Sequence, residues 1–544
     1  MPSKRNEPRP EACINIGIDF GTTYSGVAHA SSSKPNDIEN IMRWESVNQN
    51  NEDLEKVPTV IHFNTSTRWA PRETTWGLAV PDDKKAIEWF KLLLVDEQNL
   101  PDNLRDSERL RDAMVNICRF NVVITVPAMW SLEAQMKMRT AAKMAGILSR
   151  RLAGETTLTL VAEPEAAALA TLADMGGEKS IEKDDILVIA DCGGGTCGLC
   201  GAITLEDAFK TFLRRKMGPS TFDQIPSKRL KIILREQWEN GIRNQFTGHF
   251  QVWTIDVPFE AIPAKDRANL TSLPTVKFNA DELKEEVFKP VFTNILALIR
   301  DQIKAVGTLG RNIGRPKYIM LVGGFGRCPY LYRVVTQKFG IEVLQSTGAK
   351  PWTAVSRGAV IHAIASQNIR GGVAAKVESR IARASYGYNY HDKFEPGKHR
   401  EEDKIWSEVF QHYRADQLMT WFLQKGQVIK NSNKSFKTRY LHHFSTMPEF
   451  IEDYILTSKA TPVPDRNNDQ VEILCTIKWQ SDLGPEQVPK FVNKEGDVFY
   501  EVEYELDMTY DGATVEFAIW HNGKKQGAEK VGLEFQQSTI LPSA

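Results

Sequence analysis

The residues best suited to chemistry lie where an apolar strand ends in an acid and a row of glycines. Residues 186–190 are all apolar, which is typical of a strand buried on both faces, and Asp191 follows them directly. Three glycines at 193–195 let the backbone approach a ligand with no Cβ in the way. The stretch therefore predicts a binding site for the phosphate groups of a nucleotide. The carboxylate could hold a hydrated cation, and the backbone amides and the Thr196 hydroxyl could bind phosphate oxygens.

An earlier stretch, residues 14–23, repeats this order of residue types. An apolar strand ends at Asp19, and Gly21 and the hydroxyls of Thr22 and Thr23 follow it. Two such turns, far apart in the sequence, predict two related halves that face each other across a cleft. The alternative is that the turns are unrelated ends of ordinary strands.

Hydrophobic periodicity predicts the elements that must position these turns. Strands are expected near residues 56–63, 121–126, 157–162 and 317–322, and helices over residues 84–95, 131–145, 163–173, 280–306 and 353–367. Ser131 is suited to cap the helix that follows it, and Gly146 is suited to end that helix. From about residue 368, short apolar runs alternate with Gly, Pro and Asn turns, a pattern typical of a β-domain.

Length and composition restrict the class of protein. A chain of 544 residues is too long for one core and predicts several domains or subdomains. Lys and Arg number 68 against 69 Asp and Glu, so charge gives no case for a nucleic-acid or membrane partner. The polar residues 1–12 are expected to be a disordered tail, unlike a secretory signal. Seven cysteines, an odd number, favour a reducing compartment and therefore the cytoplasm.

The order of motifs resembles the nucleotide-binding domain of the 70-kDa heat-shock protein family, within the actin-like ATPase superfamily. It is most similar to the divergent members without a lid that occur in filamentous fungi. The matching segments are residues 17–26, 123–128, 163–168, 191–196 and 322–329. The resemblance covers residues 14–367. It implies an α/β fold: an actin-like ATPase domain of two ribonuclease H-like halves, followed by a smaller β-rich C-terminal domain.

Domain boundaries follow from this resemblance and from the change of pattern near residue 368. The nucleotide-binding domain is expected over residues 13–370, with halves at about 13–175 and 185–367. Residues 371–544 would form the β-rich domain, a degenerate form of the family's substrate-binding domain.

The resemblance also implies a role for each matching residue. Asp19 and Asp191 would hold a hydrated magnesium ion, and Glu163 would help to orient the attacking water. Lys91, at the position where the family keeps a lysine, would face the γ-phosphate. The implied contacts to ATP or ADP come from hydroxyl groups, glycine backbones, a tyrosine and two arginines beside the adenine: Thr22, Thr23 and Thr196; Gly21, Gly193, Gly194, Gly195, Gly201, Gly323 and Gly324; Tyr24; Arg243 and Arg327.

The sequence departs from the family at several places. The family continues into a β-hairpin after the second phosphate loop, whereas here residues 197–202 follow Thr196 at once and resemble a later glycine-rich loop over the phosphates. The chain between Lys91 and Asn121 is too short for the small lobe that caps the cleft, and the family's interdomain linker and helical lid have no counterpart. Either coding sequence has been omitted or the protein is a reduced paralogue.

These observations favour a weak, chaperone-type ATPase. It would bind ATP with magnesium, hydrolyse it slowly, and couple closure of the cleft to unfolded or specific client proteins; the oligomeric state stays open. Alternatives are a nucleotide-binding scaffold that does not hydrolyse ATP and, from the same superfamily, a small-molecule kinase. Cys192, Cys197 and Cys200 have a spacing that also occurs in ferredoxins, and the last two could form a redox pair, but the glycines and threonine between the first two favour phosphate.

Overall fold

The structure, a computed structural model, falls into two compact units, Met1–Lys376 and Val377–Ala544. It describes residues 13–42, 44, 46, 54–63, 74–81, 84, 86–88, 91, 119–128, 130–149, 153–175, 181, 185–193, 202–262, 267, 272, 274–308, 315–348, 350–367, 379–430, 435–480, 483–510, 515–526 and 531–535.

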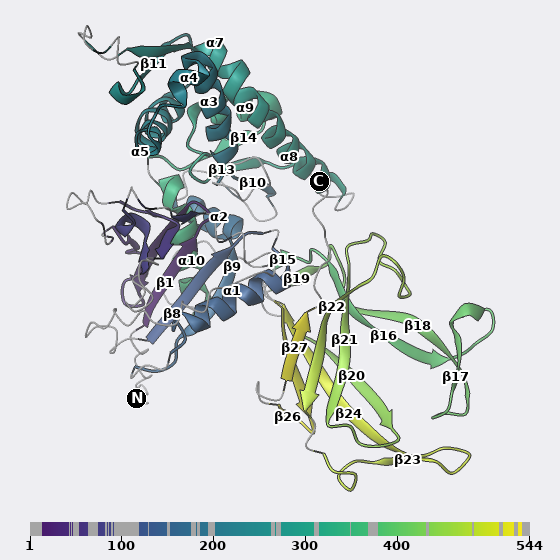
Figure 1. Ribbon diagram of the computed structural model, residues 1–544. Helices are drawn as coiled ribbons and strands as arrows, with labels where there is room; N and C mark the ends of the chain where they lie inside the picture. Colours follow the sequence, from purple (N-terminus) through teal and green to yellow (C-terminus); the bar gives the residue numbers. More distant parts are fainter. Residues whose placement is uncertain are drawn as a thin grey trace, which may run out of the picture. The chain divides into compact units, whose positions relative to one another are not determined.

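The first sheet of unit 1 places the first acidic turn at the end of its central strand (Figure 1). Its strands lie in the order β3-β2-β1-β8-β9, and β4 also pairs with β2. Their bounds are β1 (Cys13–Phe20), β2 (Tyr24–Ser31), β3 (Glu39–Asn40), β4 (Val57–Pro58), β8 (Arg119–Val126) and β9 (Thr157–Ala162). β1 is antiparallel to β2 and parallel to β8, which is parallel to β9. The last six residues of β8 are buried, as expected for a strand covered on both faces.

A second sheet of unit 1 repeats the parallel part of this arrangement. β10 (Leu187–Asp191), β13 (Tyr318–Val322) and β14 (Glu342–Leu344) lie side by side and are parallel. Only a short stretch separates the end of β10 from the helix α3 (Ala202–Met217). Among the residues that the structure describes, no antiparallel hairpin therefore extends this sheet beside β10.

Helices pack against these strands largely where the sequence predicts them. The bounds are α1 (Leu132–Met144), α2 (Glu163–Asp174), α9 (Pro329–Phe339) and α10 (Lys350–Ser366). The Ser131 hydroxyl caps α1 by accepting a hydrogen bond from the Ala134 amide at 3.2 Å. α2 and α10 cross closely, because a Cβ built on Gly358 would lie 1.7 Å from the Ala166 carbonyl oxygen. Arg357 of α10 makes two hydrogen bonds of 2.8 Å to Asp174 of α2.

Residues 84–95 do not form the predicted helix where the structure describes them. Ile87 and Glu88 form strand β7 (Ile87–Glu88), which pairs with β5 (Val60–Phe63) beside β6 (Thr74–Trp76). Lys91 is also described, and residues 92–95 lie outside the described part. The prediction is wrong for Ile87 and Glu88 because pairing with a neighbouring strand outweighs a short helical pattern, which is marginal on its own.

The remainder of unit 1 is a mainly helical region with an aromatic core. Its elements are α4 (Pro219–Phe222), α5 (Ser227–Ile232), the π-helix η4 (Ile233–Arg243), β11 (Val252–Asp256), β12 (Thr275–Asn279), α7 (Ala280–Leu283), the π-helix η6 (Lys284–Phe288) and α8 (Lys289–Thr308). The helix predicted over residues 280–306 is thus present with a π-helical segment. Phe209 stacks on Trp238 at 4.0 Å between ring centroids, and Phe246 stacks on Phe288 at 4.7 Å. These rings anchor the helices behind β10 and β13.

The regular secondary structure described in unit 2 is all strand, apart from the short 3₁₀ helix η7 (Glu401–Asp403) (Figure 1). One sheet has the order β17-β18-β16-β21-β22-β27, another has the order β20-β24-β25-β26 with β23 beside β24, and β15 pairs with β19. The longer strands are β16 (Ser385–Lys393), β18 (His412–Leu423), β20 (Ser435–Phe444), β21 (Phe450–Ser458), β22 (Glu472–Gln480), β24 (Val498–Tyr510) and β25 (Val515–His521). The shorter strands are β15 (Ser379–Ile381), β17 (Lys404–Ser407), β19 (Val428–Lys430), β23 (Lys490–Val492), β26 (Lys524–Lys525) and β27 (Val531–Phe535). Side chains from both larger sheets form one core, which includes Ile455, Trp479 and Leu506. In neither unit is a described helix long and apolar enough to cross a lipid bilayer.

Candidate phosphate and metal site

The ends of β1, β10 and β13 and the start of α2 meet around one small cavity of unit 1. Its volume is about 60 Å³. Three carboxylates, two glycine turns and one lysine line it, together with hydroxyl and aromatic side chains: Asp19, Glu163 and Asp191; Gly21, Gly193, Gly323 and Gly324; Lys56; Thr22, Thr23, Tyr24, Trp352 and Val355. The structure therefore brings together the acids that the two sequence motifs predicted. This volume is far below the several hundred Å³ usual for small-molecule pockets, so the cavity by itself does not hold a whole nucleotide.

Lys91 does not line this cavity but is entirely buried next to it, where it contacts the cavity residue Glu163. Its side chain has 0% exposure, and its ammonium group donates a hydrogen bond of 2.7 Å to Glu163 Oε1. The same ammonium lies 5.4 Å from the centroid of the Trp130 ring. Burial raises the pKa of Glu163, and the nearby Lys91 charge partly opposes that rise. The pair thus holds a carboxylate and an ammonium together where water is excluded.

Lys56 is a residue of this site that the sequence did not single out. Its ammonium group lies 2.5 Å from Asp19 Oδ2, and the two side chains are 8% and 6% exposed. The pairing of Ser25 with Val57 between β2 and β4 brings Lys56 to Asp19. In the sequence Lys56 is only a lysine before a short strand, so no local signal distinguishes it from a surface residue.

The pKa of the Asp191 carboxyl, which also lines the cavity, is raised well above its usual range. Burial is the largest cause, followed by the negative charges of Glu163 and Asp19, and together they raise the pKa of Asp191 to about 7. A bound divalent cation would reduce the repulsion between these carboxylates. It would take the place of the proton that Asp191 otherwise binds.

The pH dependence of metal binding should report this pKa. Between pH 6 and pH 8 the affinity for Mn²⁺, used as a probe for magnesium, is expected to rise about tenfold as a proton leaves Asp191. Titrations followed by electron paramagnetic resonance would measure it. In Asp191→Asn the affinity should be lower and nearly constant over this range. A wild-type affinity that does not change with pH would contradict the assignment of Asp191 as a ligand.

The residues present fit a magnesium–phosphate group. The buried Thr22 hydroxyl has no hydrogen-bond partner among the described residues, as expected of a group aimed at a ligand. Gly323 has φ +86, and a Cβ there would lie 2.6 Å from the Cys192 backbone, so only glycine leaves this turn open. Within the described residues no group of three or more His, Cys, Asp and Glu side chains is arranged to hold a metal. Because magnesium usually keeps several waters and takes only one or two carboxylates, Asp19 and Asp191 would be enough to hold it with water and phosphate oxygens.

The two arginines predicted beside the adenine do not line this cavity. Arg243 is buried and pairs with Glu239 at 2.8 Å, and its Nε has no partner in the part of the chain that the structure describes. Arg243 and Glu239 both influence the phenol of Tyr24, whose pKa is raised chiefly by burial. Tyr24 in turn contacts Trp352 edge to face at 5.1 Å between ring centroids. Arg327 lies close enough to Glu55 to lower the pKa of that carboxyl, although burial raises it overall.

Several predicted residues lie outside the described part of the chain. They are Gly194, Gly195, Thr196 and Gly201, and with them Cys197 and Cys200 of the alternative metal or redox interpretation. Their roles stay predictions. Cys192 and Cys328, which are described, are buried cysteines.

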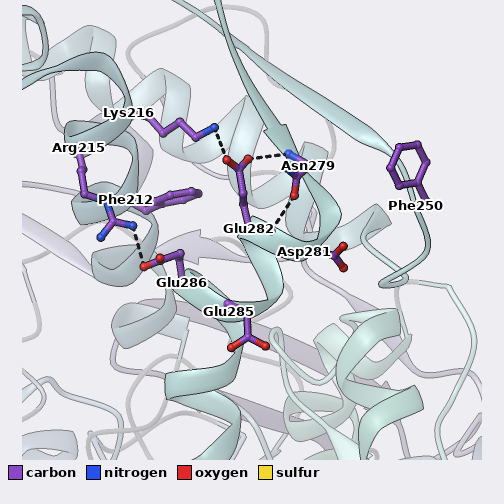
Figure 2. A pocket seen from close by; sticks show the side chains of 9 residues that line it. All are labelled: Phe212, Arg215, Lys216, Phe250, Asn279, Asp281, Glu282, Glu285 and Glu286. Atoms are coloured by element: carbon purple, nitrogen blue, oxygen red, sulfur yellow. Dashed lines mark hydrogen bonds and ion pairs between the residues drawn. The ribbon is translucent and has the colours of Figure 1, made fainter.

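A larger pocket of about 680 Å³ lies elsewhere in unit 1, and its two basic side chains are paired with glutamates (Figure 2). Lys216 lies 2.7 Å from Glu282, and Arg215 lies 2.7 Å from Glu286. Glu282 also belongs to the capping box of α7 with Asn279. The charged groups of this pocket that are described above already take part in ion pairs and in a helix cap. The small acidic cavity is therefore the better candidate site.

Comparisons with known proteins agree with the resemblance seen in the sequence. Residues 380–534 match a domain of unknown function, DUF8568. Heat shock 70 kDa protein 12A of Homo sapiens is 23% identical, over 77% of this chain and 79% of the relative, and its counterpart in Mus musculus is 22% identical with the same coverage. The mitochondrial-type heat shock protein 70 of Encephalitozoon hellem is 26% identical, over 66% of this chain and 64% of the relative. The predicted similarity to a divergent heat-shock-70-like protein is confirmed.

Proposed function

Because this chain is a divergent relative of the 70-kDa heat-shock proteins, we propose that it binds ATP and ADP with magnesium and hydrolyses ATP slowly. One observation carries the proposal. Asp19, Glu163 and Asp191, which are far apart in the sequence, line one cavity together with the glycine turns at 21, 193, 323 and 324. A nucleoside triphosphate requires carboxylates that hold a hydrated cation and backbone amides that its phosphates can reach.

Phosphoryl transfer asks a protein mainly for positioning and charge stabilisation. Magnesium, when bound, supplies positive charge at the phosphate oxygens, and Asp19 and Asp191 are the residues that would hold it. The Thr22 hydroxyl and the backbone of Gly21 and Gly193 would bind phosphate oxygens. Glu163, fixed by its 2.7 Å contact with Lys91, would orient the attacking water, and the buried Lys91 charge would stabilise the transferring group.

The wider architecture of the proposal is an actin-like domain of two ribonuclease H-like halves. The parallel order β10-β13-β14 matches the order β1-β8-β9, which supports two related halves. The strand-rich unit 2 would be the degenerate substrate-binding-like domain and would bind client or partner proteins when the cleft closes. The cytoplasm stays the proposed compartment, on the odd number of cysteines.

A direct test combines binding and single-turnover hydrolysis in the wild type, Asp191→Asn and Glu163→Ala. The wild type is expected to bind magnesium ADP and to hydrolyse ATP slowly. Glu163→Ala should bind nucleotide but lose about 100-fold or more in turnover, a usual size for loss of a general base or positioning group. Asp191→Asn should lose most of its magnesium-dependent binding. Calorimetry and quenched-flow assays give the two quantities.

A control for this test is Glu285→Gln, which changes an exposed acid paired with Lys289 on the surface. Its binding and turnover should equal those of the wild type. Failure of the wild type to bind ADP or ATP at all would refute the proposal. Binding without turnover in every variant would favour the alternative, a non-hydrolysing nucleotide-dependent scaffold. That alternative is supported by Lys56, which already pairs with the proposed metal ligand Asp19.

A further inference from the structure

The side chain of Lys56 packs closely against three neighbouring groups of unit 1. A Cβ placed on Gly26 would lie 2.9 Å from Lys56 Cγ, so the glycine leaves room for the lysine stem. The Lys56 ammonium also lies 4.9 Å from the centroid of the Trp352 ring, in cation–π contact. Trp352 itself closes against Gly324, where a Cβ would lie 2.3 Å from its ring. Lys56 is therefore held from three sides, by the Gly26 surface, the indole and Asp19.

The position of Lys56 conflicts with metal binding at Asp19. At 2.5 Å the ammonium group takes the Oδ2 atom that a magnesium ion would need. Lysine and a divalent cation repel each other at such distances, most strongly where both are shielded from water. The conflict has a simple resolution, because Lys56 borders the same cavity as Thr22 and the glycine turns and has a flexible stem.

We propose that Lys56 competes with the metal ion for Asp19 and, once displaced, binds the terminal phosphates of the nucleotide. This inference rests on the proposed function and adds a second cationic residue to the phosphate site beside Lys91. Lys56 would then weaken binding of the metal alone and strengthen binding of the metal together with nucleotide. The protein would therefore take up magnesium mainly as the magnesium–nucleotide complex.

The test measures two affinities whose changes should have opposite signs. In Lys56→Met, which keeps most of the apolar stem, the affinity for Mn²⁺ alone is expected to rise about tenfold, because a competing charge is lost. The affinity for magnesium ADP and for a slowly hydrolysed ATP analogue is expected to fall about 10- to 100-fold, the usual range for a lost charged hydrogen bond. Electron paramagnetic resonance measures the first affinity and calorimetry the second.

Two further variants separate this role from a structural one. Lys56→Arg keeps the charge and should restore much of the nucleotide affinity. Lys317→Met removes another lysine of unit 1. Lys317 does not line the cavity and pairs with Asp185 at 2.7 Å, so both affinities should stay unchanged. If Lys56→Met lowered both affinities, Lys56 would be a structural residue. If it changed neither, the inference would be wrong.

Failure of the proposed function gives a different pattern. A wild type that binds Mn²⁺ but neither ADP nor the ATP analogue refutes the proposed function and, with it, the transfer of Lys56 to phosphate. The Mn²⁺ titration then still decides whether Lys56 competes for Asp19. If the wild type and Lys56→Met bind nucleotide equally tightly, the proposed function stands, but the proposed role of Lys56 is wrong.

Discussion

Replacing Lys91 by methionine is expected to lower the free energy of unfolding of unit 1 by about 3–5 kcal/mol, the usual cost of breaking a buried ion pair. The ammonium is fully buried and lies 2.7 Å from Glu163, so its removal leaves a carboxylate without its partner in a dry site. Chemical unfolding in urea, followed by the spectroscopic signal of unit 1, measures the change.

The pH dependence of this loss gives a second observable. Burial raises the pKa of Glu163 in the folded chain above its ordinary value. A carboxyl group with a raised folded pKa contributes stability at low pH and loses that contribution as the pH rises through the folded pKa. Without Lys91 the pKa should rise further, so the destabilisation should be larger at pH 8 than at pH 5.

A double variant tests whether the effect belongs to the pair. Lys91→Met combined with Glu163→Gln removes both charges and should recover much of the lost stability, because no ionised group is left buried. Equal destabilisation in the single and double variants would show that Lys91 acts through packing, for example against Trp130, rather than through Glu163.

Replacing Gly358 by valine is expected to prevent stable folding of unit 1. A Cβ at this position would lie 1.7 Å from the Ala166 carbonyl oxygen and 2.3 Å from its carbon, both backbone atoms. Backbone cannot move aside as a flexible side chain can, so α2 and α10 would have to separate. Gly358→Ala is sufficient to create this contact, although alanine would otherwise favour a helix over glycine by about 1 kcal/mol.

Whether Gly358→Ala lowers or raises the stability of unit 1 therefore tests how closely α2 and α10 cross. We expect Gly358→Ala to lower the melting temperature and the free energy of unfolding by several kcal/mol, as overpacking at a rigid contact does. Gly484→Ala is the control, since a Cβ there meets nothing within 4 Å and Gly484 is not in the left-handed region of φ. Stabilisation by Gly358→Ala would show that the helices do not cross as closely as the structure has them.

Some of the fold could be predicted because its signals are local. β8 contains the apolar run 122–124 and β10 the apolar run 187–190, and α1 begins after a capping serine. Pro164 favours the first turn of α2, where its missing amide hydrogen costs nothing. Residues 87 and 88 could not be predicted in this way, since their strand exists only through pairing with β5.

The sequence by itself determined the candidate acids, the glycine turns and the similarity to the heat-shock-70 proteins, because residue type and order along the chain encode these features. The tertiary structure alone decided which charges meet. Lys56 and Asp19 are 37 positions apart, and Lys91 and Glu163 are 72 apart, so neither contact follows from a local pattern. The pairing of β2 with β4 places Lys56 next to Asp19, and the low exposure of both pairs then strengthens their electrostatic interactions.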